Sequence, residues 1–143
     1  VLHYGWLSPR RQEVLARMAA TGLRVKVLDR CFGAERDAYI ARAKTVLQVR
    51  AEIRYRVFEI VRASYLMTNG VAVISEWDDG TVIEPDIAQG VLLAAYDDLP
   101  HAARLLCADA GARAALADRG REIMAARPQR AYLAEALREL LPA

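Results

Sequence analysis

The sequence predicts an α/β protein, with a Rossmann-like, doubly wound parallel sheet of about five strands and a C-terminal helical tail. Short apolar runs typical of buried strands alternate with segments of helical periodicity along residues 1–95. The stretch Tyr55–Trp77 shows the unit most clearly, because a helical pattern stops at Asn69-Gly70 and passes directly into the apolar run 71–74. Strands that alternate with helices form parallel sheets covered on both faces, joined by right-handed crossovers.

The first strand and helix are marked by their ends. Residues 1–6 are rich in apolar and aromatic side chains and predict a strand that ends at Gly5. Ser8 then offers an N-cap hydroxyl, and Pro9 suits the first helical position, where a backbone N–H has no partner in any case. An apolar face continues until Gly22, which ends the helix.

The rest of the chain continues the alternation. Apolar runs predict further strands at 23–28, 45–49, 71–74 and 90–95. Helical periodicity predicts helices at 34–43, 58–67, 97–108, 111–126 and 131–141. In the helix at 34–43 we expect Ala38, Ile40 and Ala41 to face inward. We expect an irregular segment around Pro85 and a basic loop at 50–56, at the carboxyl end of the sheet where open α/β sheets bind ligands.

The length of 143 residues suggests a single domain, residues 1–143. Its first residues already resemble a strand, so we expect the chain to be a fragment of a longer protein, and the resemblance described below implies that it is the C-terminal half of a two-domain protein. No apolar run approaches the roughly 20 residues of a membrane helix, and the start lacks the charge order of a signal peptide. Cys31 and Cys107 are too few for a disulfide framework and lack metal-ligand spacing. We therefore expect a cytoplasmic protein with no membrane span.

Charge is distributed unevenly along the chain. Residues 1–62 hold 13 Arg or Lys against 6 Asp or Glu, whereas residues 63–143 hold 7 against 12. Nearly all the cations are arginines, whose planar guanidinium suits bidentate phosphate contacts. An anionic ligand on the first half and a solvated basic surface are both open interpretations. We expect no nucleic acid as a partner, because no matching motif accompanies the charge.

Common nucleotide and catalytic motifs are missing. No G-x-G-x-x-G follows the first strand and no G-x-x-x-x-G-K-[ST] occurs, which argues against ordinary NAD binding and P-loop chemistry. No G-x-S-x-G is present either. His3 and His101 stand alone, so we expect them to be structural or exposed. The sequence therefore predicts no metal and no cofactor, and it assigns no catalytic residue.

The turn from Gly5 to Arg11 has two elements of an anion site. Gly5 permits a close approach of the backbone, and Ser8 heads a helix whose free N–H groups point outward. Arg10 and Arg11 lie in the first helical turn, where the helix dipole disfavours cations, so we expect an anion to balance them. They are candidates to clamp a diphosphate. The alternative is a basic helix start that is exposed to solvent.

Glu59 and Arg62 are charged residues in and beside the apolar stripe of the third helix. A buried arginine must be paired, and Glu59, three positions earlier, offers an internal ion pair. The functional interpretation is that the Glu59 carboxylate accepts hydrogen bonds from ribose hydroxyls while Arg62 faces a phosphate. Both interpretations can hold together.

Several segments carry a family resemblance: GWLSPRRQEVLARMAATGLRV, FGAERDAYIARAKTVLQV, VFEIVRASYLMTNGVAVISE, VLLAAYDDLPHAARLLC and ARAALADRGREIMAARP. Through them nearly the whole chain resembles the C-terminal half of GT-B-type glycosyltransferases, in the group-1-like bacterial branch related to spore-coat glycosyltransferases. The resemblance implies a donor-binding domain of polysaccharide biosynthesis, with the acceptor held by a separate N-terminal domain. It also implies that Gly5 to Arg11 form the donor-phosphate loop, that Glu59 contacts the donor nucleotide, and that the terminal helices pack back across the fold.

The expected function is therefore transfer of a sugar from an NDP-sugar to an acceptor, with this fragment inactive alone. The expected donor-binding residues are Gly5, Ser8, Arg10, Arg11, Glu59 and Arg62. The alternative is a non-catalytic Rossmann-like module that binds a nucleotide or serves as an interaction domain. Met67 favours it, because it stands where the family's E-x7-E spacing would place a second glutamate after Glu59.

Overall fold

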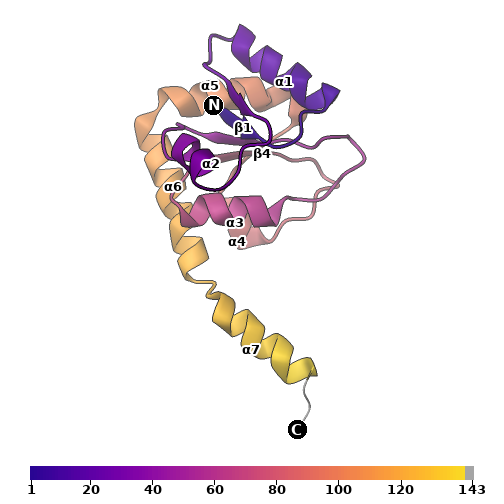
Figure 1. Ribbon diagram of the computed structural model, residues 1–143, viewed down its shortest axis with the longest axis vertical. Coiled ribbons are helices and arrows are strands. Elements are labelled where there is room, and N and C mark those ends of the chain that lie inside the picture. The colour runs from indigo at the N-terminus through magenta and orange to yellow at the C-terminus, as the bar shows by residue number, and fades with distance from the viewer. Residues whose placement is uncertain (141–143) are drawn as a thin grey trace.

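The computed structural model describes residues 1–140 and confirms the α/β fold, with five strands in one parallel sheet (Figure 1). The strands are β1 (Leu2–Tyr4), β2 (Lys26–Leu28), β3 (Val46–Gln48), β4 (Val73–Glu76) and β5 (Leu92–Ala94). Their order across the sheet is β2-β1-β3-β4-β5. The strand order therefore reverses between β1 and β3, since β2 lies on one side of β1 and all later strands lie on the other.

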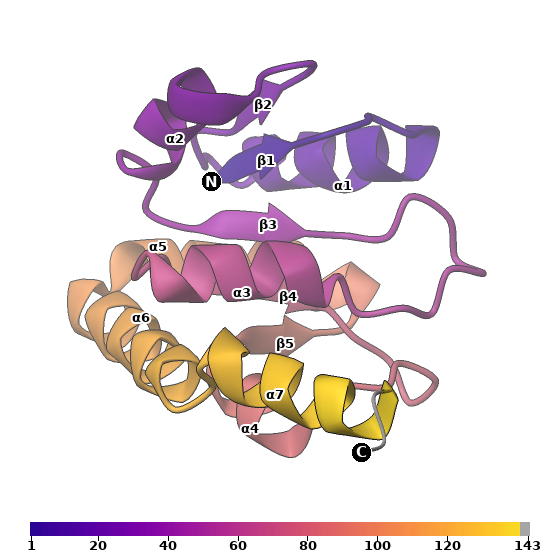
Figure 2. The same cartoon turned by 60° about the horizontal axis from the view of Figure 1, so that its bottom comes forward.

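Helices cover both faces of the sheet, as a doubly wound fold requires (Figure 2). They are α1 (Pro9–Ala20), α2 (Gly33–Ile40), α3 (Ile60–Thr68), α4 (Pro85–Gln89), α5 (Leu99–Ala108), α6 (Ala110–Ala125) and α7 (Gln129–Leu140), with a 3-10 turn η1 at Tyr96–Asp98. Helices α1 and α5 pack together on one face. Helices α2, α3 and α4 cover the other, and α6 packs against α3, α4 and α5.

Each face has its own apolar core, because the central strands are buried on both sides. On the face of α1 and α5 the core contains five side chains that are fully buried: Val14, Met18, Leu47, Ile74 and Leu99. On the opposite face the core is built from Leu2, Tyr4, Ile40, Val46, Phe58, Ala63, Leu66, Met67, Val73, Ile87 and Ile123. Burying a large apolar side chain contributes roughly 1.5–3 kcal/mol, so these two layers hold the strand ends in place.

Helix α2 and strand β2 differ from the prediction. Strand β2 begins only at Lys26. In α2 the side chain of Ile40 is buried as expected, but Ala38 and Ala41 are exposed, so the predicted inward position of these two alanines is wrong. The physical reason is that an alanine gains little from burial, so the larger Ile40 and the partly buried Tyr39 decide which side of the helix packs on the core.

The segment around Pro85, expected to be irregular, forms the short helix α4. Pro85 occupies its first turn, and Ile87 is buried in the core. Arg127, after α6, donates hydrogen bonds to both Glu84 and Asp86 at the start of this helix. The local sequence predicted a break because of the proline, whereas tertiary contacts stabilise one and a half turns of helix.

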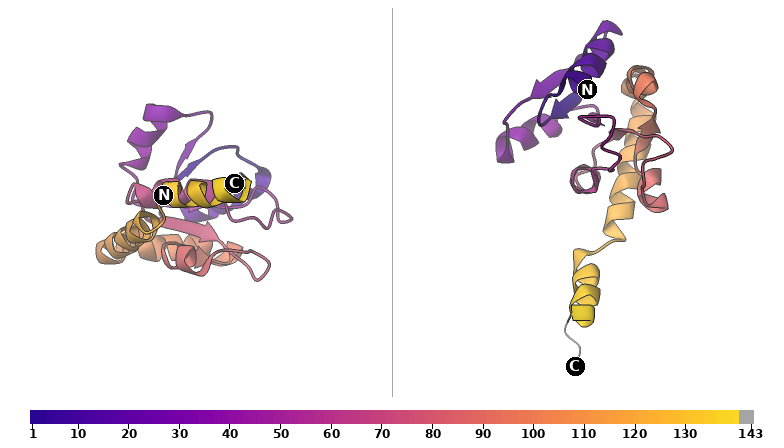
Figure 3. Two further views of the ribbon diagram at one scale, coloured as in Figure 1. Left: turned by 90° about the horizontal axis from the view of Figure 1, so that it is seen from below. Right: turned by 90° about the vertical axis from the view of Figure 1, so that its right-hand side faces the viewer.

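Helix α7 points away from the rest of the fold (Figures 1 and 3). None of its residues is buried, and four large side chains are more than half exposed: Tyr132, Leu133, Leu137 and Leu140. The expectation that the terminal helices pack back across the fold is therefore wrong for α7, although α6 packs closely. Leu141, the expected end of this helix, lies outside the described residues. Within residues 1–140, no helix combines the length and apolar character needed to cross a membrane.

Candidate functional site

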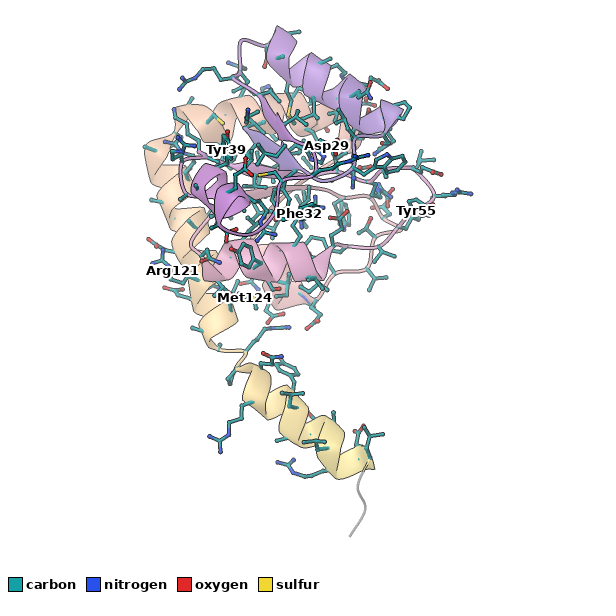
Figure 4. The ribbon with its side chains drawn as sticks, in the orientation of Figure 1. Asp29, Phe32, Tyr39, Tyr55, Arg121 and Met124 are labelled. Atoms are coloured by element: carbon teal, nitrogen blue, oxygen red, sulfur yellow. The ribbon has the colours of Figure 1, made fainter. Side chains whose placement is uncertain are left out.

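The predicted site residues come together at the carboxyl edge of the sheet, where β1 and β3 diverge. The loop after β1 reaches α1, and beside it runs the loop at 49–59 that follows β3. Ser8 joins the two, because its Oγ donates a hydrogen bond to the Ala51 carbonyl at 2.7 Å. Figure 4 shows Tyr55 at the outer end of the second loop. Open α/β sheets bind their ligands at such a switch point.

The first β-α turn has the backbone that the sequence predicted. Gly5 adopts φ +108°, in the region that favours glycine. Ser8 is the N-cap of α1, and its Oγ accepts a hydrogen bond from the Arg11 N–H at 3.3 Å. One of the N–H groups expected to face a ligand is therefore already satisfied inside the protein.

Arg11 is anchored within the fold by its whole guanidinium. Its Nε donates to the Val49 carbonyl at 2.8 Å, and its Nη1 donates to the Trp6 carbonyl at 2.8 Å. Its Nη2 donates to Glu59 Oε1 at 3.0 Å. Burial lowers the pKa of the Arg11 guanidinium, while the adjacent Glu59 carboxylate acts in the opposite direction. The anion predicted to balance Arg11 is thus a carboxylate of the same chain.

Glu59 links the start of α1 to α3. It is the N-cap residue of α3, and its Oε2 accepts from Arg62 Nε at 3.0 Å, which confirms the predicted pair between positions i and i+3. Its backbone carbonyl accepts from Gln48 Nε2 at 3.0 Å. The Glu59 side chain is 37% exposed, so a ligand can still reach the carboxylate that holds both arginines.

Arg62 places its guanidinium directly against the first β-α turn. Its Nη2 lies 3.2 Å from the position that a Cβ on Gly5 would occupy, and its Cζ lies 4.7 Å from the centroid of the Tyr4 ring. Only Nε is used by Glu59, and among the described residues the buried Nη1 has no hydrogen-bond partner. The side chain is 18% exposed. This is a partly solvated cation with unused donor capacity at the strand switch point.

A second ion cluster surrounds Glu76 at the end of β4. Arg10 binds its carboxylate in a bidentate way, with distances of 2.6 Å from Nη1 and 2.5 Å from Nη2. Arg50 adds its Nη2 at 2.7 Å and its backbone N–H at 3.0 Å. Arg50 Nη2 also contacts Asp78 Oδ2 at 2.7 Å, and the Arg10 guanidinium stacks 3.7 Å from the Tyr96 ring centroid.

The Glu76 side chain is 1% exposed, yet it remains ionised because of these partners. Burial alone would raise its pKa, but hydrogen bonds from Arg10 and Arg50 outweigh burial and hold the pKa below its ordinary value. Burial acts to lower the pKa of the Arg50 guanidinium, but the hydrogen bonds that Arg50 donates to Asp78 and Glu76 outweigh burial and raise it. The guanidinium of Arg10, predicted to clamp a diphosphate, therefore already binds the carboxylate of Glu76.

Sequence reasoning missed Glu76, Arg50 and Gln48 as parts of the site. A signal for Glu76 existed, because it follows the apolar run 71–74 at the carboxyl end of a predicted strand, and it is the last residue of β4 in the structure. Nothing local marked Arg50 as the partner of Glu76. Gln48, Phe58, Glu59 and Glu76 are among the residues that line a cavity of about 10 Å³ at this edge, which has room for about one water molecule.

The two histidines have the structural and exposed roles that the sequence predicted. His3 is fully buried in β1, with Nδ1 3.3 Å from the Leu47 carbonyl oxygen. Burial lowers its pKa to about 4, so the ring is neutral at pH 7. His101 is exposed in α5. Within residues 1–140, no three His, Cys, Asp or Glu side chains are arranged to hold a metal ion.

The arrangement combines four arginines with three carboxylates around an exposed loop junction. Such a set binds anions by charge-assisted hydrogen bonds, and its carboxylates can accept hydrogen bonds from hydroxyl groups. Comparisons with protein-family models, curated protein sequences and solved structures found no match to this chain.

Proposed function

We propose that the chain is the donor-binding domain of a glycosyltransferase, which transfers a sugar from an NDP-sugar to an acceptor. The observation that carries the proposal is the Arg62 guanidinium beside Gly5. Arg62 Nη2 is 3.2 Å from the place where a Cβ on Gly5 would lie, at the β1–β3 switch point. A diphosphate above Gly5 approaches the backbone closely and accepts hydrogen bonds from a cation that keeps spare donors.

Glu59 is proposed to recognise the nucleoside. A carboxylate offers about four lone-pair sites, and the described contacts use one on each oxygen. Two hydroxyls of a ribose fit the remaining acceptors. Arg11 and Arg62 hold the carboxylate in one orientation, which lowers the entropy that ligand binding must otherwise cost.

Ser8, Arg10 and Arg11 are proposed to position the loops and side chains of the donor site without contacting the donor directly. Ser8 ties the first loop to the second through Ala51, and Arg11 orients Glu59. Arg10 holds Glu76, which in turn fixes the backbone at Arg50. Leaving-group charge is then stabilised by Arg62 and the start of α1, with no metal required by the proposal.

A further domain of the same polypeptide is proposed to cover this edge and hold the acceptor, so the chain alone is inactive. Large apolar side chains are exposed around the edge, with exposures of 62% for Trp6, 71% for Ile53, 75% for Val57, 82% for Val61 and 86% for Val82. Apolar residues gathered in this way are typical of a surface that meets a partner. The unpaired apolar side of α7 supports the same proposal.

A non-catalytic nucleotide-binding or interaction module is the second candidate. It is favoured by the ion pairs of Arg10 and Arg11, because each arginine expected to hold phosphate already has a carboxylate partner. These ion pairs balance the arginine charges without a bound ligand, so they can serve a purely structural role. In this case a nucleotide binds weakly, and the sugar adds nothing to affinity.

Calorimetric titration with UDP, GDP and their sugar conjugates tests the proposal. We expect one binding site, and we expect Arg62→Ala to weaken binding roughly 10- to 100-fold, the effect of losing one or two charged hydrogen bonds. Glu59→Ala should weaken it as well. Arg138→Ala, on exposed helix α7, is the matched control and should leave affinity unchanged.

The proposal fails if the folded wild-type chain binds none of these compounds, or if neither Arg62→Ala nor Glu59→Ala alters the affinity. Circular dichroism of each variant separates a lost site from a lost fold. Equal affinity for NDP and NDP-sugar, with no contribution from the sugar, favours the second candidate.

A further inference from the structure

A second hollow lies at the amino edge of the sheet, opposite the candidate donor site. Its volume is about 650 Å³, within the usual range for pockets that hold small molecules. Its walls come from the start of β1, the segment between α1 and β2, the segment after α2, and the last turns of α5. Apolar side chains such as Leu2, Val25 and Ala43 form part of the lining. The hollow is therefore built by segments that are distant in sequence.

The charged side chains that line this hollow are all cationic. Among the residues that line it, none is acidic and five are cationic: Arg24, Lys26, Arg42, Lys44 and Arg104. Within residues 1–140 none of these five forms an ion pair, in contrast to the arginines of the opposite edge. Lys44 Nζ donates to the Cys107 carbonyl at 3.1 Å, its one hydrogen bond among the described residues. Asp109, close by in sequence, is used as the N-cap of α6.

Two of the cations lie near the ring of Tyr39. Lys26 Nζ and Arg42 Cζ each lie 5.0 Å from the centroid of its ring. The two charges are therefore at most about 10 Å apart, a separation at which salt screens them only partly. Figure 4 shows Tyr39 and Tyr55 on opposite sides of the molecule, which separates this cluster from the loop of the donor site.

We propose that this hollow binds a small polyanion that carries two or more phosphate groups. A concave surface lined by one sign of charge focuses the field and concentrates counter-ions. Arginine forks match phosphate oxygens in a bidentate way, and three of the five cations are arginines. The apolar lining and Tyr39 accommodate an organic body attached to the phosphates. The volume of the hollow favours a small molecule over an extended chain.

The binding site is independent of the proposed donor site. Its cations lie before or at the start of β2, before β3, or in α5, whereas Gly5, Glu59 and Arg62 lie at or beyond the carboxyl ends of β1 and β3. Removing charge at the amino edge should therefore leave nucleotide binding at the carboxyl edge intact. This separation lets one experiment test the two sites apart.

The test is calorimetry of the chain with sodium tripolyphosphate and with orthophosphate at low salt. We expect one tripolyphosphate per chain, bound at least about tenfold more tightly than orthophosphate because several cations act on one ligand. The double variant Lys26→Ala/Arg42→Ala should bind tripolyphosphate roughly tenfold more weakly. Arg130→Ala/Arg138→Ala removes the same charge from exposed α7 and should bind like the wild type.

Amide chemical shifts in the tripolyphosphate titration identify the edge that is used. Shifts at residues 22–26 and 42–44 support the proposal. No saturable binding, shifts confined to 5–11 and 59–62, or equal weakening in the α7 control overturns it. Tighter binding of an acidic peptide or an RNA oligonucleotide than of tripolyphosphate also overturns it. UDP affinity, measured on the same Lys26→Ala/Arg42→Ala sample, distinguishes failure at this site from failure of the donor site.

Discussion

Arg11 Nη2 and Glu59 Oε1 lie 3.0 Å apart and join the helix start after β1 to the helix start after β3. The two residues are 48 positions apart in the sequence. The arginine is 6% exposed and the glutamate 37% exposed, so the pair runs from the interior to the surface of the candidate site. It couples the proposed phosphate loop to the proposed nucleoside contact.

Replacing Glu59 by alanine is expected to lower the free energy of unfolding by about 1–2 kcal/mol. Arg11 is then left buried without its carboxylate, although the partial exposure of Glu59 limits the loss. Urea unfolding at pH 7 measures the change. Glu52→Ala breaks the more exposed pair with Arg54 in the same loop and should cost less than about 0.5 kcal/mol. Equal losses for the two variants would contradict the role given to Glu59.

Glu76→Ala should be far more damaging, by about 3–5 kcal/mol, because it leaves Arg10 and Arg50 without their shared buried partner. The control is Asp97→Ala, whose pair with Arg17 is largely exposed and should be worth less than about 1 kcal/mol. Denaturant unfolding of both variants provides the comparison. A loss for Glu76→Ala no larger than that of the control would refute the central place of the cluster.

Lowering the pH should remove the contribution of Glu76 to the stability of the fold. Its pKa in the folded protein lies below the ordinary value of 4.5, so its stabilisation is complete above that value and is lost as pH falls through the folded pKa. Glu76→Gln keeps the shape but not the charge. We expect this variant to be less stable at pH 7 and to lose less stability than the wild type below pH 4.5. Unfolding curves at pH 3, 4, 5 and 7 test this.

His3 should make the stability of the fold depend on pH in a second, higher range. Burial lowers its pKa from 6.5 to about 4, so the unfolded chain binds the proton more readily than the folded one between these values. The resulting stability is present above pH 6.5 and is lost progressively down to about pH 4, for a total of about 3 kcal/mol. His3→Leu should flatten the stability profile between pH 6.5 and 4.5. A slope unchanged by the substitution would show that His3 does not titrate in this way.

Gly90 and Gly111 differ in the space that a side chain would have. A Cβ at Gly90 would lie 2.5 Å from Met67 Cε and 3.1 Å from Gly120 Cα, so Gly90→Val should destabilise the fold by about 1–3 kcal/mol through overpacking. The nearest atom to a Cβ at Gly111 is 3.4 Å away, and Gly111→Ala should gain up to about 1 kcal/mol from helix propensity. Thermal unfolding of both variants should give opposite shifts, and shifts of equal sign would contradict this packing.

Much of the fold could be predicted from the sequence because the signals are local. The cap at Ser8 and Pro9 is read from adjacent residues, and the structure confirms it. The turn at Asn69-Gly70 likewise ends α3 before β4. Helix α4 could not be predicted in the same way, because contacts from Arg127 hold a segment whose own sequence suggested a break.

The candidate site was predicted only in part. The pair of Glu59 and Arg62 follows from helical spacing and is present. The partners of Arg10 and Arg11 were not predicted, because Glu76 and Glu59 are distant in sequence and reach the arginines only when three strands end at one edge. An anion near the two arginines was expected, but its identity as a carboxylate of the same chain was not.

The sequence by itself determined the alternation of strands and helices and hence the parallel α/β fold, since periodicity and capping act over a few residues. Only the tertiary structure decided that Glu76 holds Arg10, that Arg62 keeps unused donors beside Gly5, and that the cations of the amino edge remain unpaired among the described residues. The physical reason is that these outcomes depend on which strand ends lie side by side in the sheet. That arrangement sets which charges meet and which are left for a ligand.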